Sequence, residues 1–307
     1  MITSLIQCSS SPHISTTSPC TAGPTHSSFQ PTTILISAHR GSADSWYNDQ
    51  VDGIFNTSAE LELARRLVET GRDPGEADRL ARLILRFLIL PSPPDSDSNF
   101  PRFGELQKKL ESVTFQGNGE EIEDAFLELY AHVHMNEAPY TSEERRRMDE
   151  AGGYWNHAGG LSPVLKAEPW IKPDTVSADF GAGNGLQGLL LQLLYPHAKT
   201  VQIEISSRLA DIGESLREWL GVAEDRVEWI IDDVLDVSAT GYDFIYLYRP
   251  VRPEGAGRGF YTRFASEVEG EDPPPVIFSI ADCLRDFLSD RYEVFYGDGH
   301  LTCFKPR

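Results

Sequence analysis

The spacing of apolar positions divides the chain into two patterns. Between about residue 56 and residue 152, apolar residues recur at intervals of three and four, which is the period of one buried helix face. Paired capping residues mark two of the helix starts, Thr57 with Glu60 and Thr141 with Glu144, and Pro91 ends the second helix. The pattern predicts helices near residues 58–70, 74–90, 103–115, 119–134 and 142–152.

After Trp170 the pattern changes to short β-rich runs separated by helical stretches. The predicted strands are residues 175–180, 200–205, 227–231, 242–248, 275–280, 292–297 and 300–305. Helical periodicity between the first five strands predicts right-handed crossovers and hence a parallel sheet. Asp298-Gly299 is a hairpin turn signal, so the last two strands are predicted to form an antiparallel edge. We therefore expect an α/β fold with a seven-stranded, mostly parallel sheet and a C-terminal antiparallel hairpin.

Composition completes the predicted domain organisation. Residues 1–45 are rich in Ser, Thr and Pro and lack a period, so we expect a disordered tail there. Residues 46–165 are predicted to form a helical N-terminal cap domain, and residues 166–307 a cofactor-binding domain.

Charge and hydrophobicity limit the expected partners. With 40% hydrophobic residues the chain can bury a core. The apolar run Leu83 to Leu90 is too short to cross a bilayer, and the N-terminus lacks the pattern of a signal peptide. We therefore expect a cytoplasmic protein with no membrane partner. The net charge of −20 would repel a polyanion, so no nucleic acid partner is expected. The four cysteines show no C-x-x-C spacing, and no metal site is expected.

The stretch SADFGAGNGLQG, residues 177–188, contains four glycines directly after the first predicted strand. Glycine at such a strand-to-helix turn lets backbone N–H groups approach a ligand. Read from Gly183, the spacing is G-x-G-x-x-G, which suits a dinucleotide with Glu204 near its ribose. Read from Asp179, it is an acid at the strand tip followed by three alternating glycines.

The second pattern resembles the first motif of class I S-adenosylmethionine-dependent methyltransferases. The resemblance implies a Rossmann-like fold, S-adenosylmethionine as cofactor, an acid for the ribose hydroxyls after the second strand and another near the adenine after the third. Glu204 and Asp233 stand at those places, and the terminal hairpin also fits. The residues predicted to bind the cofactor are Asp179, Phe180, Gly181, Gly183, Asn184, Gly185, Glu204, Ile205, Asp232, Asp233 and Val234.

The acceptor side is predicted from two loops. After the fourth strand the chain has Tyr246-Leu-Tyr-Arg-Pro250, which departs from the Asn/Asp-Pro-Pro-Tyr/Phe sequence of enzymes that methylate base or glutamine nitrogens. Tyr248 and Arg249 are predicted to face the acceptor. The glycine-flanked segment at residues 152–163 is predicted to form a lid over it. That segment supplies Tyr154, Trp155 and Asn156 for substrate binding and His157 as a base at neutral pH, whereas His132 and His134 are expected at the surface or in packing.

The sequence thus predicts methyl transfer from S-adenosylmethionine to an acceptor that is not nucleic acid. A small molecule is favoured because a helical cap would enclose one, and a basic, lysine-bearing protein is also possible. Two further functions stay open: an S-adenosylmethionine-binding module without turnover, and an NAD-binding oxidoreductase. The methylated atom and the oligomeric state stay open as well.

Overall fold

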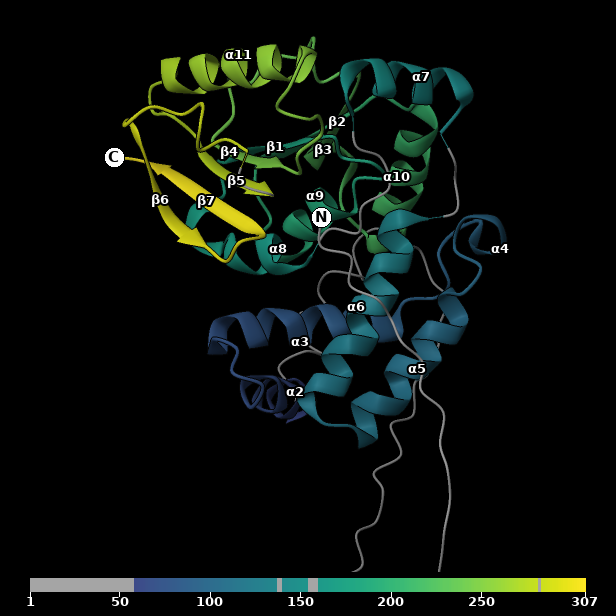
Figure 1. Ribbon diagram of the computed structural model, residues 1–307. Coiled ribbons are helices and arrows are strands. Elements are labelled where there is room, and N and C mark those ends of the chain that lie inside the picture. The colour runs from purple at the N-terminus through teal and green to yellow at the C-terminus, as the bar shows by residue number, and fades with distance from the viewer. Residues whose placement is uncertain (1–57, 137–139, 154–159, 281–282) are drawn as a thin grey trace, which may run out of the picture. The chain divides into compact units, whose positions relative to one another are not determined.

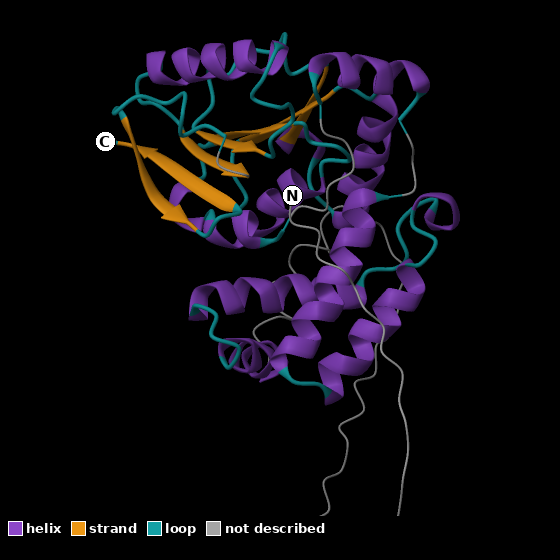
Figure 2. Cartoon of the chain, in the orientation of Figure 1, coloured by secondary structure: helices purple, strands orange, loops and turns teal. Residues whose placement is uncertain are grey.

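The computed structural model describes residues 58–136, 140–153, 160–280 and 283–307. Its centre is a seven-stranded sheet with the strand order β3-β2-β1-β4-β5-β7-β6 (Figures 1 and 2). The strands are β1 (Val176–Phe180), β2 (Lys199–Glu204), β3 (Val227–Ile231), β4 (Phe244–Leu247), β5 (Val276–Ile280), β6 (Tyr292–Gly297) and β7 (Leu301–Pro306). The five strands from β3 to β5 in this order are parallel, and β7 is antiparallel to both of its neighbours. The predicted Rossmann-like fold class is confirmed.

The strand order reverses direction between β1 and β4. The chain passes from β1 outward to β2 and β3, and then returns to β4 on the other side of β1. In open sheets of this kind, ligands bind beyond the carboxyl ends of the strands at such a reversal. The glycine-rich loop begins at this place, directly after Phe180.

Helices cover both faces of the sheet. The face opposite α11 is covered by α9 (Leu186–Leu194) and α10 (Ser207–Leu220), while α11 (Ala256–Gly270) lies on the other face (Figure 1). Alternate residues of each strand supply the two cores, as the two-residue period of a strand requires. Phe244 and Tyr246 of β4 face the α9 core, while Ile245 and Leu247 face the α11 core.

The helical region before the sheet, residues 58–151, continues the α9 core. Its helices are α2 (Ser58–Val68), α3 (Pro74–Ile89), α4 (Ser96–Asn99), α5 (Phe103–Gln116), α6 (Gly119–Met135) and α7 (Ser142–Ala151). Side-chain hydrogen bonds tie it to the sheet part: for example, Trp219 Nε1 donates to Pro91 O at 2.8 Å, and Arg86 donates to Leu220 O at 2.6 Å. The described residues all belong to one compact unit. The predicted boundary at residues 165 and 166 therefore separates two secondary-structure patterns that share a core.

Local capping explains where several helices begin. Asp73 accepts from the N–H groups of Gly75 and Glu76 at the start of α3, and Thr141 and Glu144 form the predicted capping box of α7. The predicted partner Thr57 lies outside the described residues, as does the predicted tail. The sequence pattern did not predict the short helices α4 and α8 (Ser162–Lys166), because segments of four or five residues carry too few turns to show a period. Within the described ranges, no helix is both long and apolar enough to cross a membrane.

Candidate functional site

Three glycines of the loop after β1 have positive φ, each in a different environment. The φ angles are 83° at Gly181, 59° at Gly183 and 68° at Gly185. A Cβ at Gly185 would come within 2.7 Å of the Trp229 indole, so this glycine is required for packing. A Cβ at Gly183 would have no neighbour within 4 Å. The backbone at Gly183 therefore has free space beside it, whereas the backbone at Gly185 is packed against Trp229.

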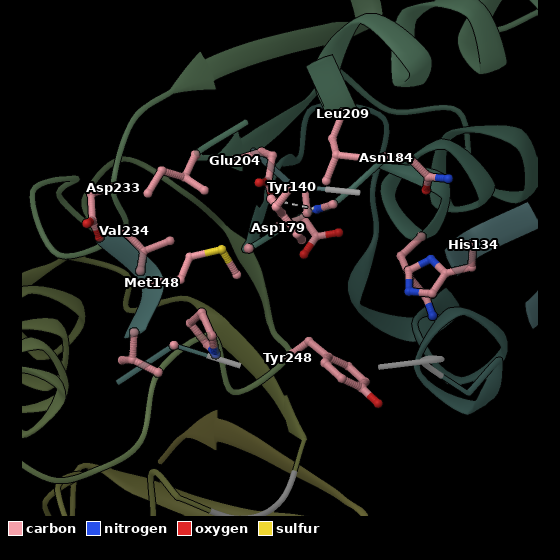
Figure 3. A pocket seen from close by; sticks show the side chains of 18 of the residues that line it. His134, Tyr140, Met148, Asp179, Asn184, Glu204, Leu209, Asp233, Val234 and Tyr248 are labelled. Carbon is pink, nitrogen blue, oxygen red and sulfur yellow. Dashed lines mark hydrogen bonds between the residues drawn. The ribbon is translucent and has the colours of Figure 1, made fainter. Parts of the chain in front are cut away.

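The loop borders a pocket of about 310 Å³ at the carboxyl end of the sheet. Figure 3 shows Glu204 and Asp179 near its centre, Asp233 and Val234 on one side, and His134 and Tyr248 on the other. The volume is at the lower end of the range found for small-molecule sites. Predicted site residues that line the pocket are Asp179, Gly181, Gly183, Asn184, Glu204, Ile205, Asp233, Val234 and Tyr248.

Glu204 is the residue that joins the glycine loop to the end of β2. One carboxylate oxygen accepts from Gly183 N at 2.9 Å and the other from Ser206 N at 3.0 Å. The side chain is 3% exposed. Burial raises the pKa of its carboxyl to about 7, and the two backbone donors oppose that rise. A carboxylate offers about four lone-pair positions, so positions that these backbone donors do not use remain to accept hydrogen bonds from a ligand such as a diol.

Asp179 lies at the tip of β1 with 3% exposure. Burial, and then the nearby charge of Glu204, raise the pKa of its carboxyl to about 8. No described residue donates a hydrogen bond to its Oδ1 atom. An unpartnered carboxyl in a buried wall is costly, and a positively charged ligand would relieve that cost.

The two aspartates after β3 are separated by the structure. Asp233 lines the pocket, and its carboxylate lies 4.0 Å from the guanidinium of Arg147 on α7. Asp232 is exposed and does not line the pocket; its carboxylate accepts from Asp233 N at 2.8 Å. Asp233 is thus the acid available to a ligand at this end, and Asp232 caps the turn.

Several predicted residues lie elsewhere. Phe180 is fully buried, and its ring packs against Phe264 on the α11 face, so its side chain does not reach the pocket. Gly185 and Arg249 do not line the pocket either. The predicted acceptor residues Tyr154, Trp155, Asn156 and His157 lie outside the described residues. Their roles, like those of the residues that do line the pocket, remain predictions.

The helical region supplies a wall of the pocket, and the sequence did not predict which of its residues form that wall. Its contributors are His134, Met135, Asn136, Tyr140, Arg145, Met148 and Ala151. The last turn of α6 is held at the glycine loop because Asn184 Nδ2 donates to Val133 O at 2.7 Å. His134 stacks on Tyr130 and also lines the pocket, a place that the expectation of a surface or packing residue did not include. Its spacing of four residues from Tyr130 predicts a shared helix face, but not that this face meets a ligand.

Tyr140 and α7 close the pocket near Glu204. Burial, and then the charge of Glu204, raise the pKa of the Tyr140 phenol above its ordinary value. A β-bridge between Gly153 and Val251 and a hydrogen bond from Arg252 N to Gly152 O join the end of α7 to the loop after β4. The pocket is therefore bounded by the sheet edge on one side and by the helical region on the other.

Comparison with known proteins gives a likeness in fold. No protein-family model and no curated protein matches the sequence. Among solved structures, an RNA methyltransferase from Salinibacter ruber in complex with S-adenosyl-L-homocysteine is 18% identical over 48% of this chain and 90% of that chain, with a TM-score of 0.36. An rRNA methylase from Streptococcus thermophilus is 12% identical over 47% and 94%, with a TM-score of 0.36. The YcgJ protein from Bacillus subtilis is 16% identical over 39% of this chain and 48% of its own length, with a TM-score of 0.32.

These findings correct the exclusion of nucleic acid as a partner. Solved structures named as RNA methyltransferases are among those similar to the chain. The physical reason is that net charge sums over the whole surface, whereas binding depends on the potential at the site. A net charge of −20 therefore does not decide the acceptor class.

Proposed function

We propose that the chain is an S-adenosylmethionine-dependent methyltransferase whose cofactor occupies the pocket at the end of β1, β2 and β3. The observation that carries the proposal is the hydrogen bond from Gly183 N to the Glu204 carboxylate at 2.9 Å. In a dinucleotide site, the loop N–H groups face a pyrophosphate. Here a carboxylate accepts from one of them, and that carboxylate would repel phosphate.

The acidic groups of the pocket support a cationic cofactor over an anionic one, because a cation favours their ionised forms. Asp179, Glu204 and Asp233 all line it, and the first two are buried. S-adenosylmethionine carries a sulfonium and an ammonium group, both positive, whereas NAD carries a negative pyrophosphate. An NAD-binding oxidoreductase is therefore the weaker proposal.

Each wall of the pocket has a proposed task. The remaining lone pairs of Glu204 would accept from the two ribose hydroxyls, and Asp233 would accept from the adenine amine. Gly183 leaves room for the ligand, since nothing lies where its Cβ would point. When bound, the cofactor supplies an activated methyl group for in-line displacement. The chain positions the acceptor and excludes water.

For the acceptor we propose a small molecule that meets the cofactor between Tyr248 and the wall from α6. Both segments line the pocket, and a site walled in this way suits a compact acceptor beside the cofactor. Tyr248 is half-buried, and burial raises the pKa of its phenol, so it would act as a neutral hydrogen-bonding group. A module that binds S-adenosylmethionine without turnover is the second candidate, because the acids that line the pocket support binding of the cofactor and do not themselves require a methyl transfer.

The test is a methyl-transfer assay with S-adenosylmethionine carrying a labelled methyl group. Acceptors are offered as three separate panels: small-molecule extract, RNA and basic proteins. Label in the small-molecule panel, lost in Tyr248→Ala with unchanged binding of S-adenosylhomocysteine, supports the full proposal. Label in RNA or protein would keep the methyltransferase and refute the small-molecule acceptor. Binding of S-adenosylhomocysteine with no label in any panel would favour the binding module.

A further inference from the structure

Three buried oxygen atoms on the pocket wall have no hydrogen-bond partner among the described residues. They are Asp179 Oδ1, Gln187 Oε1 and Tyr246 Oη. All three residues line the pocket, and each is 2–3% exposed. Asp179 and Tyr246 are directly paired neighbours on β1 and β4, and Gln187 lies in the first turn of α9. Buried polar atoms normally have partners, so three orphans in one wall point to a ligand.

The orientation of the Gln187 amide is fixed from the helical region. Its Nε2 atom donates to Tyr130 Oη of α6 and to Gly160 O at 2.9 Å, which uses both of its N–H groups. Only the oxygen is left to face the pocket, and it acts solely as an acceptor. Tyr130 is itself held in place, being 1% exposed and stacked on His134 with ring centroids 5.6 Å apart.

We propose that Tyr130 is a positioning residue that turns Gln187 so that Gln187 Oε1, Asp179 Oδ1 and Tyr246 Oη together bind one primary ammonium group. An ammonium carries three N–H donors and a positive charge. The wall offers three oxygen atoms, one of them from a carboxylic acid that ionises more readily beside a cation. The inference rests on the proposed function and extends it, because it gives residues of α6 and α9 a part in ligand binding.

The ammonium has two chemical sources in a methyltransferase site. It belongs either to the aminoacyl end of the cofactor or to an amine acceptor. Three ligands distinguish them: S-adenosylhomocysteine, its 3-carboxypropylthio analogue, which lacks only the amino group, and methylammonium. Each is titrated calorimetrically into the full-length chain and into Tyr130→Phe.

The matched control is Tyr292→Phe. Tyr292 is also buried, and its hydroxyl donates one hydrogen bond, to Pro275 O at 3.0 Å, away from the pocket. A thermal melt of each variant shows whether it is folded. The double variant Tyr130→Phe with Gln187→Glu tests rescue, because a carboxylate offers an oxygen whichever way it is turned.

If the cofactor supplies the ammonium, Tyr130→Phe weakens S-adenosylhomocysteine by about tenfold and leaves the analogue unchanged, since one charge-assisted hydrogen bond is lost. Adding Gln187→Glu to Tyr130→Phe then restores the preference for S-adenosylhomocysteine over the analogue. Tyr292→Phe leaves both affinities unchanged. If an acceptor supplies it, both nucleosides bind Tyr130→Phe as they bind the wild type, and methylammonium binds the wild type but not Tyr130→Phe.

The inference is overturned if Tyr130→Phe, correctly folded, changes neither the preference for the amino group nor the binding of methylammonium. Failure of the proposed function has a different signature, in which neither nucleoside binds the wild type. In that case the methylammonium titration alone tests whether the three oxygen atoms bind an ammonium group.

Discussion

Replacing Asp179 by Asn should stabilise the ligand-free protein at neutral pH and remove most of a pH dependence of its stability. Asp179 is 3% exposed, and burial followed by the charge of Glu204 raises its pKa from 3.8 to about 8. An acid with a raised native pKa holds its proton in the folded state after the unfolded state has lost it. Stability therefore falls as the pH rises from about 4 to about 8.

The magnitude follows from the shift. Each pKa unit corresponds to about 1.4 kcal/mol, so at about pH 7.5 the acid lowers the free energy of unfolding by at most about 5 kcal/mol. Water penetration and relaxation reduce such values, and we expect Asp179→Asn to be more stable by about 2 to 5 kcal/mol. The neutral amide keeps the size of the carboxyl and carries no charge to desolvate.

The assay is urea unfolding of both proteins at several pH values between 4 and 8, with the slope of the transition compared to verify the same unfolding reaction. The two free energies should converge near pH 4 and separate steadily above it. Asp243→Asn is the matched control, because the Asp243 carboxylate accepts from Val176 N at 2.8 Å at the opposite end of β1. Parallel curves for wild type and Asp179→Asn would refute the reasoning.

Four further results are expected. Gly183→Ala should weaken the binding of S-adenosylhomocysteine by at least tenfold in calorimetry, because the new methyl group would point into the open space beside the loop. It should lower the free energy of unfolding by only about 1–2 kcal/mol, because the strain comes from a φ of 59° at one residue. The affinity of wild type for S-adenosylhomocysteine should rise between about pH 6 and pH 8, because a cation favours the ionised form of Asp179; a flat profile would contradict this. His197→Ala should cost about 2–4 kcal/mol in urea unfolding with unchanged ligand affinity, because its buried ring bonds Ser177 and Thr200 at 2.9 Å outside the pocket. Asp233→Asn should weaken ligand binding more than Asp232→Asn, since only Asp233 lines the pocket; equal effects in the same titration would reverse that assignment.

The fold could be predicted because each strand and helix carries its own period. The observed strands begin and end within two residues of the predicted ranges, and the hairpin turn at Asp298-Gly299 joins β6 to β7. The sequence also predicts that Gly183 and Glu204 lie close together. A glycine loop after one parallel strand and an acid after the neighbouring strand lie at the same edge of the sheet.

The rest of the site depends on contacts between segments far apart in the chain. The helical period of α6 shows that Tyr130 and His134 share a face, but not that this face meets the glycine loop. Asp232 and Asp233 are indistinguishable by composition, and only the path of the backbone after β3 exposes one and turns the other inward. Net charge was a poor basis for excluding nucleic acid, because it does not say where on the surface the charges lie.

The central claim is that the pocket binds S-adenosylmethionine through Glu204. The most direct test is calorimetric titration of S-adenosylhomocysteine and NAD into wild type and Glu204→Gln. Glutamine keeps the size of the side chain but removes the charge that strengthens its hydrogen bonds, which is worth on the order of tenfold or more in affinity. We predict that wild type binds S-adenosylhomocysteine and not NAD, and that Glu204→Gln binds it at least tenfold more weakly. Binding of NAD without S-adenosylhomocysteine, or equal affinity in Glu204→Gln, would contradict the account.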